Sequence, residues 1–180
     1  MQTAPTAKTY AIDPAHSEVG FSIRHMMVSK VTGHFNGFTG TIGIAEDGDT
    51  PTELNAAIDA GSINTRNEKR DGHLKNADFF ETDTHAQITF ESTSITRTGD
   101  AFTAVGDLTL HGVTKSVTLT GEVGGHVKDP WGNDRVGYTA KGSIVRKDFD
   151  LNFQTPLEGG GFMLGDNVDL DLAIEAIPQK

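Results

Sequence analysis

Apolar and polar residues alternate along most of the chain from Tyr10 onward, a period of two that is typical of β-strands with one buried face. About eight segments show it, with apolar positions at Val19, Phe21 and Ile23; Phe38, Gly40, Ile42 and Ile44; Leu54, Ala56 and Ile58; Ile88 and Phe90; Phe102, Ala104, Gly106, Leu108 and Leu110; Val117, Leu119, Gly121 and Val123; Val136, Tyr138, Ala140, Gly142 and Ile144; and Val168, Leu170, Leu172 and Ile174. Most connections are too short for crossover helices, and the short turn at His111 and Gly112 predicts an antiparallel hairpin. The pattern therefore predicts an all-β fold, an antiparallel barrel or sandwich.

Two segments depart from the alternation. Thr65 and Glu68 are spaced as in a capping box, with the Thr65 hydroxyl on the amide of residue 68 and the Glu68 carboxylate reaching back. They predict a short helix that ends near residue 75, with a solvated face at Arg70, Asp71 and His73. Residues 25–34 are expected to form a second short helix or a folded loop.

Composition raises the question of whether the interior is filled. Hydrophobic residues make up only 36% of the 180 residues, and Gly occurs 21 times. Small residues on the apolar faces allow two interpretations, a tapered filled barrel or a hollow one with room for one small ligand. Aromatic residues and methionines in the connections favour the hollow interpretation, because they suit an apolar guest at a barrel mouth. These residues are Phe35, Phe38, Phe79, Phe80, Phe162, Met26, Met27 and Met163.

Charge and termini exclude several classes of function. A net charge of −10 disfavours nucleic acid and a polybasic membrane contact. The start of the chain has no apolar run of signal-peptide length, so we expect a cytoplasmic protein without stable membrane insertion. Residues 1–7 are expected to be a disordered tail, and residues 8–180 a single domain.

Candidate chemistry is sparse. There is no cysteine, which removes thiolate nucleophiles and zinc–thiolate sites. His16, His25 and His34 are spaced by nine, but an odd separation along a strand points side chains to opposite faces, so we predict no metal site from them. We expect no enzyme. Two alternatives stay open: an enzyme acting on a lipid-like substrate through a pair such as His25 and Asp148, and a filled barrel that acts through protein partners.

Four signatures in order resemble the YceI-like family of bacterial lipid-binding proteins, over roughly residues 8–177. They are Asp13-Pro14-Ala15-His16-Ser17 with Phe21, His25, Gly33, Phe35, Phe38 and Gly40; Ser62-Ile63-Asn64-Thr65 with Arg70-Asp71-Gly72-His73-Leu74, Asp78-Phe79-Phe80 and Ile88-Thr89-Phe90-Glu91-Ser92; Gly106-Asp107-Leu108-Thr109-Leu110-His111-Gly112-Val113-Thr114-Lys115; and Arg146-Lys147-Asp148-Phe149. Ala86 and Ser116 stand where proline is usual. Asp150 stands where glycine is usual. If that position needs a positive φ, Asp tolerates it better than most residues, whereas if the glycine gives a ligand clearance, Asp150 would narrow or polarise the site.

The resemblance implies an antiparallel eight-stranded lipocalin-like barrel capped by one or two short helices. It implies a hydrophobic tunnel for a long-chain amphiphile such as a polyisoprenoid, an isoprenoid quinone or a fatty amide, which is carried or sequestered. It further implies a homodimer, with no catalytic residue and no cofactor other than the bound lipid.

By matched position the tunnel lining is expected at Phe21, Ile23, Phe35, Phe38, Ile42, Leu74, Phe79, Phe80, Phe90, Leu108, Leu110, Leu119, Tyr138 and Phe149. Met27 and Val28 are candidates for a lid. His25 and Arg146, the latter with Asp148, are candidates for contacts with a polar head group.

Overall fold

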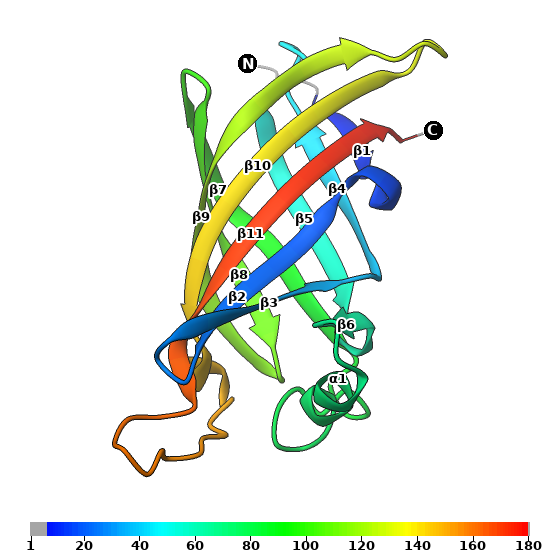
Figure 1. Ribbon diagram of the computed structural model, residues 1–180. Helices are drawn as coiled ribbons and strands as arrows, with labels where there is room; N and C mark the ends of the chain where they lie inside the picture. The colour runs from blue at the N-terminus through cyan, green and yellow to red at the C-terminus, as the bar shows by residue number, and fades with distance from the viewer. Residues whose placement is uncertain (1–6, 180) are drawn as a thin grey trace.

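Antiparallel pairing runs around the whole molecule and closes on itself in the computed structural model, which describes residues 7–179 (Figure 1). The strands are β1 (Lys8–Ile12), β2 (Glu18–His25), β3 (Ser29–Phe35), β4 (Phe38–Ile44), β5 (Pro51–Asp59), β6 (Ile63–Asn64), β7 (Gln87–Thr98), β8 (Ala101–Leu110), β9 (Val113–Lys128), β10 (Asp134–Val145) and β11 (Leu164–Pro178). The helices are α1 (Glu68–Leu74) and three single 3₁₀ turns, η1 (Pro14–His16), η2 (Ala60–Ser62) and η3 (Arg146–Phe149). None of the helices within residues 7–179 is long and apolar enough to cross a membrane.

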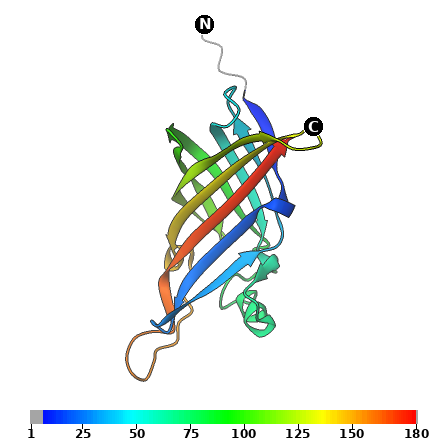
Figure 2. The same cartoon turned by 45° about the horizontal axis from the view of Figure 1, so that its top comes forward.

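The pairing confirms a closed eight-stranded antiparallel barrel. Strand β11 pairs with β10 along one edge and with both β2 and β1 along the other, so β1 and β2 together occupy one strand position. In the same way β3 and β4 together occupy the next position, because β3 pairs with β2 and β4 pairs with β1. Strands β5 and β6 occupy the position after that, because β6 pairs with β3 and β5 pairs with β4. The strands tilt around the barrel axis, as both views show (Figures 1 and 2).

The expectation of a helix or loop over residues 25–34 is wrong for most of that segment. Strand β3 pairs with β2 along its whole length, and only Met26 to Val28 form the turn between them. Met26 and Met27 have φ angles of 50° and 62°, which complete a tight hairpin. The alternation of Val31, Gly33 and Phe35 was the available signal, since it has the same period of two as the predicted strands.

The helix starts differently from the predicted capping box. Asn67 is the N-cap, and its side chain accepts a hydrogen bond from the Arg70 amide. The Thr65 hydroxyl instead donates to the Asp71 carboxylate at 2.5 Å, and the same carboxylate accepts from the Thr65 amide. The end of the helix near residue 75 is confirmed, with Lys75 as the C-cap.

Large rings lie over glycines within the barrel wall. A side chain at Gly121 would meet the Phe102 ring at 2.6 Å, and one at Gly33 would meet the Phe21 ring at 2.5 Å. Each glycine is the direct cross-strand partner of its phenylalanine. Part of the small-residue pattern therefore accommodates neighbouring rings rather than leaving empty space.

The two ends of the barrel differ. One end carries β1 and the C-terminal part of β11 (Figure 1). This end is filled, and Val136, Ala104 and Ala176 there are fully buried. Tyr138 donates a hydrogen bond from its hydroxyl to the Asp49 carbonyl at 2.8 Å, which closes the interior at this end. The other end carries α1, the β2–β3 turn and the segment that connects β10 to β11 (Figure 1).

Candidate functional site

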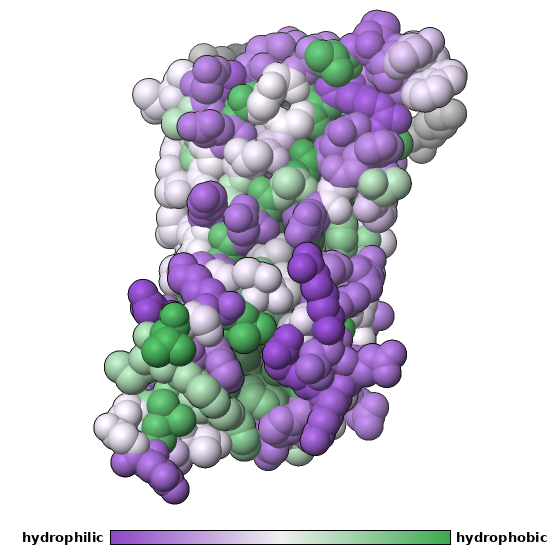
Figure 3. All heavy atoms as spheres, in the orientation of Figure 1, coloured by the Kyte–Doolittle hydropathy of each residue, from purple (hydrophilic) through white to green (hydrophobic). Residues whose placement is uncertain are grey.

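A cavity of about 780 Å³ occupies the barrel interior and reaches the end that carries α1. Its wall is almost entirely apolar inside the barrel, and polar side chains of the wall come mainly from α1 and its flanking residues. In Figure 3 hydrophobic atoms gather around a recess at this end, and the most hydrophilic atoms lie on the side where α1 is found. The volume falls within the usual range of small-molecule sites, roughly 300–1,000 Å³. A filled barrel, the alternative left open by the sequence, is therefore wrong for this half of the molecule.

Most of the residues expected to contact a ligand come together in this wall. They are Phe21, Ile23, His25, Phe35, Phe38, Leu74, Phe79, Phe80, Phe90, Leu108, Leu110, Leu119 and Arg146. The strand residues among them converge because inward-facing positions of adjacent strands recur at every second residue. Leu74, Phe79, Phe80 and Arg146 instead come from α1, the connection after it and η3.

Five expected residues lie outside the wall. Ile42 and Tyr138 are buried in the filled end, where Ile42 pairs with Tyr10 across β4 and β1. Phe149 is buried in η3, and Met27 and Val28 are 63% and 85% exposed in the β2–β3 turn. Ile42 and Tyr138 were expected in the tunnel lining because position along a signature does not reveal depth in the barrel. The lid role of Met27 and Val28 stays a prediction.

Further residues of the wall were not among those expected to line the tunnel. One group occupies inward positions of the predicted strands and could have been found from the alternation alone: Val19, Leu54, Ala56, Ile58, Ile88, Val117, Ile144, Val168, Leu170, Leu172 and Ile174. A second group belongs to α1, the start of β11 and the connections, outside the alternating series of the predicted strands: Thr65, Asn67, Lys69, Arg70, His73, Asn76, Leu151, Phe153, Met163 and Leu164.

The polar part of the wall is cationic. Lys69, Arg70 and Arg146 contribute positive charge, and no described residue of the wall carries a carboxylate. Arg70 is held in place because its guanidinium donates to the Thr65 hydroxyl and to the Thr65 carbonyl, both at 2.7 Å. Arg70 and His73, from the predicted solvated face of α1, border the cavity, and Arg70 is also exposed to solvent. We call this polar part of the wall the polar rim. Its positive charge contrasts with the net charge of −10 of the whole chain.

Arg146 is almost fully buried beneath the rim. Its guanidinium donates to the carbonyls of Leu151, Phe153 and Gly165 at 2.6–2.8 Å, which ties the β10–β11 connection to the barrel. No described residue accepts a hydrogen bond from its Nη2, which lies 4.0 Å from an oxygen of Asp166. Burial lowers the pKa of this guanidinium. The expected partner Asp148 is exposed and makes no ion pair with Arg146 among the described contacts.

The proposed catalytic pair is absent from the described part of the chain. His25 borders the cavity, but Asp148 is exposed, and no hydrogen bond or ion pair joins the two. His16, His25 and His34 do not come together in any group of candidate metal ligands within residues 7–179. Asp150 has a φ of 58° and lies outside the wall, so its backbone conformation accounts for the position where glycine is usual.

Comparison with known proteins gives consistent matches over nearly the whole chain. The YceI-like domain family matches residues 10–176. Protein YceI of Shigella flexneri is 40% identical over 176 residues, which cover 97% of this chain and 89% of that protein. The YCEI protein of Campylobacter jejuni has a TM-score of 0.75 at 28% identity, with 100% of both chains covered. A polyisoprenoid-binding domain from Saccharophagus degradans has a TM-score of 0.69 at 19% identity, with 94% of this chain and 98% of that chain covered.

Proposed function

The chain belongs to the YceI-like family, and we propose that it binds the apolar chain of a long amphiphile and carries or sequesters it. A polyisoprenoid, an isoprenoid quinone and a fatty amide are the proposed ligand classes. The observation that carries the proposal is the apolar cavity that is closed at one barrel end and reaches the other. The description of the Saccharophagus degradans domain as polyisoprenoid-binding supports the same ligand class.

The apolar wall supplies the main driving force for binding. Burying one five-carbon isoprene unit contributes roughly 3–4 kcal/mol, at about 0.8 kcal/mol per methylene equivalent. Several units therefore offset the cost of ordering the chain with few polar contacts. Such a binding mode requires no catalytic group.

The polar rim sets the orientation of the ligand. With the opposite end filled, the tail points into the barrel and the head group remains near His25, His73, Lys69, Arg70 and Arg146. These side chains favour a head group that accepts hydrogen bonds or carries negative charge, such as a quinone, an amide carbonyl or a phosphate.

The first test identifies the bound molecule. Protein expressed in bacteria is denatured and extracted with chloroform and methanol, and the extract is analysed by mass spectrometry. We expect a long-chain amphiphile at close to one equivalent. Repeated absence of any stoichiometric lipid, with no uptake of added isoprenoid quinone, would contradict the proposal.

The second test fills the cavity. Ala56→Phe places a ring in the wall, whereas Ala57→Phe adds the same ring to the opposite face of the same strand. We expect the first substitution to weaken lipid binding by about tenfold or more, since it removes space for several methylene groups, and the second to leave binding unchanged. Binding is measured by titration with an isoprenoid quinone, and circular dichroism checks that both variants fold. Equal binding by the two variants would place the ligand outside the barrel.

A binding role, rather than catalysis on a lipid-like substrate, is the function that we propose. The homodimer and the cytoplasmic location implied at the sequence level stay predictions, which size-exclusion chromatography and cell fractionation test.

A further inference from the structure

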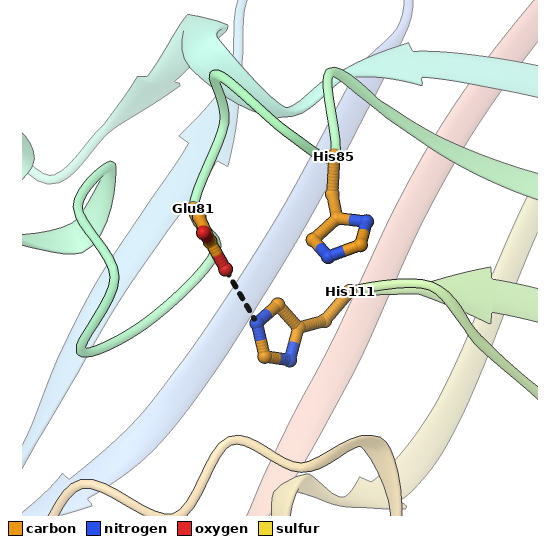
Figure 4. Close-up of side chains that lie close together, drawn as sticks. All are labelled: Glu81, His85 and His111. Atoms are coloured by element: carbon orange, nitrogen blue, oxygen red, sulfur yellow. Dashed lines mark ion pairs between the residues drawn. The ribbon is translucent and has the colours of Figure 1, made fainter.

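We propose that Glu81, His85 and His111 bind a divalent transition-metal ion, with Zn²⁺ as the best match. The three residues lie outside the cavity wall, and one ligand atom from each lies within 4.8 Å of the others. Figure 4 shows the three side chains, from two separate segments, directed toward one another. Two imidazoles and one carboxylate are a ligand set typical of zinc, and imidazole disfavours Mg²⁺ and Ca²⁺.

Hydrogen bonding prepares His111 as a ligand. Its Nδ1 lies 3.0 Å from the Phe149 carbonyl, which only accepts, so Nδ1 carries the proton in this contact. In the neutral ring, Nε2 then presents its lone pair to Glu81, whose nearer carboxylate oxygen is 3.8 Å away. Two acceptors face each other, and a cation between them removes the repulsion. A backbone carbonyl that fixes the tautomer is also the usual partner of a metal-binding histidine.

The distances require only small side-chain adjustments. Donor atoms on one tetrahedral ion, with bonds of about 2.0–2.2 Å, lie about 3.3–3.6 Å apart. The observed 3.8 Å between His111 and Glu81 is a few tenths of an ångström longer. The His85 and His111 rings have centroids 5.0 Å apart and an interplanar angle of 73°, so they do not stack flat against each other.

Backbone geometry holds the ligands in place. The Glu81 carbonyl accepts from the amides of Thr84 and His85, which brings the Glu81 and His85 side chains together across one tight turn. His111 is in a turn between β8 and β9 in which both His111 and Gly112 have positive φ. A Cβ at Gly112 would lie 2.8 Å from the His85 ring, so the two segments are in close contact at this glycine.

The other candidate cluster lacks this chemistry. Asp13, His16 and Glu175 also lie within ligand distance of one another. Arg135, however, donates from Nη1 to Asp13 at 3.1 Å and to Glu175 at 2.6 Å. Because the guanidinium already compensates both carboxylates, this cluster has little attraction left for a cation.

A bound ion would join two segments that border the cavity. Phe80 and Leu110 belong to the wall, and they directly precede Glu81 and His111 in the chain. Three protein ligands leave one coordination position for water. The ion would therefore link the connection after α1 to the β8–β9 turn. None of the three ligands belongs to the cavity wall, so the proposal does not rest on lipid binding.

The test uses the full chain without a histidine tag, stripped with a chelator and dialysed. Titration calorimetry with ZnCl₂ is expected to show one site in the wild type, and MgCl₂ to show none. Glu81→Gln and His85→Gln are each expected to weaken zinc binding by about tenfold or more. His16→Gln, in the other cluster, is the matched control and should bind zinc as the wild type does. Circular dichroism of the stripped variants checks folding.

Cobalt gives an independent readout. Co²⁺ in a site with two imidazoles and a carboxylate absorbs visible light, and the band should be present in the wild type and in His16→Gln but lost in His85→Gln. Zinc binding that is lost in His16→Gln, that is unchanged in both Glu81→Gln and His85→Gln, or that is missing from the wild type at micromolar concentrations would overturn the proposal.

Discussion

At the scale of single residues, Arg146 joins the β10–β11 connection at the end of the barrel where the cavity opens. Arg146→Lys keeps the charge but loses the planar fork that reaches three carbonyls. Since hydrogen bonds from a charged donor contribute about 1.5–3 kcal/mol each, we expect the free energy of unfolding to fall by about 3 kcal/mol. Urea unfolding measures this loss. Lys147→Met removes the neighbouring exposed pair with Asp166 and should cost less than about 1 kcal/mol; equal losses would contradict the assigned role.

Asp129 contributes to acid sensitivity at the filled end. Desolvation alone would raise the pKa of its carboxyl, but hydrogen bonds from Asn133 and Arg135 outweigh it and lower the pKa from 3.8 to about 2. The unfolded chain binds this proton more readily, so the contribution to stability is complete above about pH 4 and is lost as pH falls toward 2. Arg135→Gln should raise the pKa of Asp129 and flatten this part of the stability profile. Carbon-13 titration of the Asp129 carboxyl measures its pKa. Arg97→Gln, which removes a separate ion pair with Asp49, should leave the pKa of Asp129 unchanged.

At the scale of elements, the β2–β3 turn is exposed at the end where the cavity opens. Met27 and Val28 are outside the wall, so replacing both with Ser should leave stability and equilibrium affinity unchanged. If the turn contacts the lipid source during transfer, the rate of uptake from vesicles should fall by about tenfold, because apolar contact worth more than 1 kcal/mol is lost. Stopped-flow fluorescence measures the rate. Val127→Ser with Trp131→Ser, at exposed positions of the opposite end, should have no effect.

The elements themselves differ in how far the sequence specified them. The long strands followed from alternation, and β10 and β11 show the predicted apolar positions facing inward. The start of α1 did not, because Asn67 and Thr65 both offer capping chemistry and only the position of Asp71 decides between them. Strand β3 was missed although Val31, Gly33 and Phe35 keep the period of two, and the Phe21 ring occupies the space beside Gly33.

At the scale of the whole molecule, the bound lipid is expected to act as part of the hydrophobic core. A ligand at 100 times its dissociation constant stabilises the folded state by about 2.7 kcal/mol. For a chain of this length that corresponds to a fall in Tm of about 5–10 °C when the lipid is removed. Differential scanning calorimetry of loaded and stripped protein measures the shift. Ala56→Phe should show a smaller shift, and an unchanged Tm in the wild type would contradict a contribution of lipid to the core.

The sequence by itself determined the class of fold, the inward faces of the strands and the resemblance to a family, because these depend on local period and on residue order. Only the tertiary structure decided which end of the barrel is filled, since the depth of Tyr138 and Ile42 depends on strand tilt and closure. It also decided that the rim is cationic and that Glu81, His85 and His111 converge. Those contacts join connections that are distant in the chain, and no local pattern encodes the distance between them.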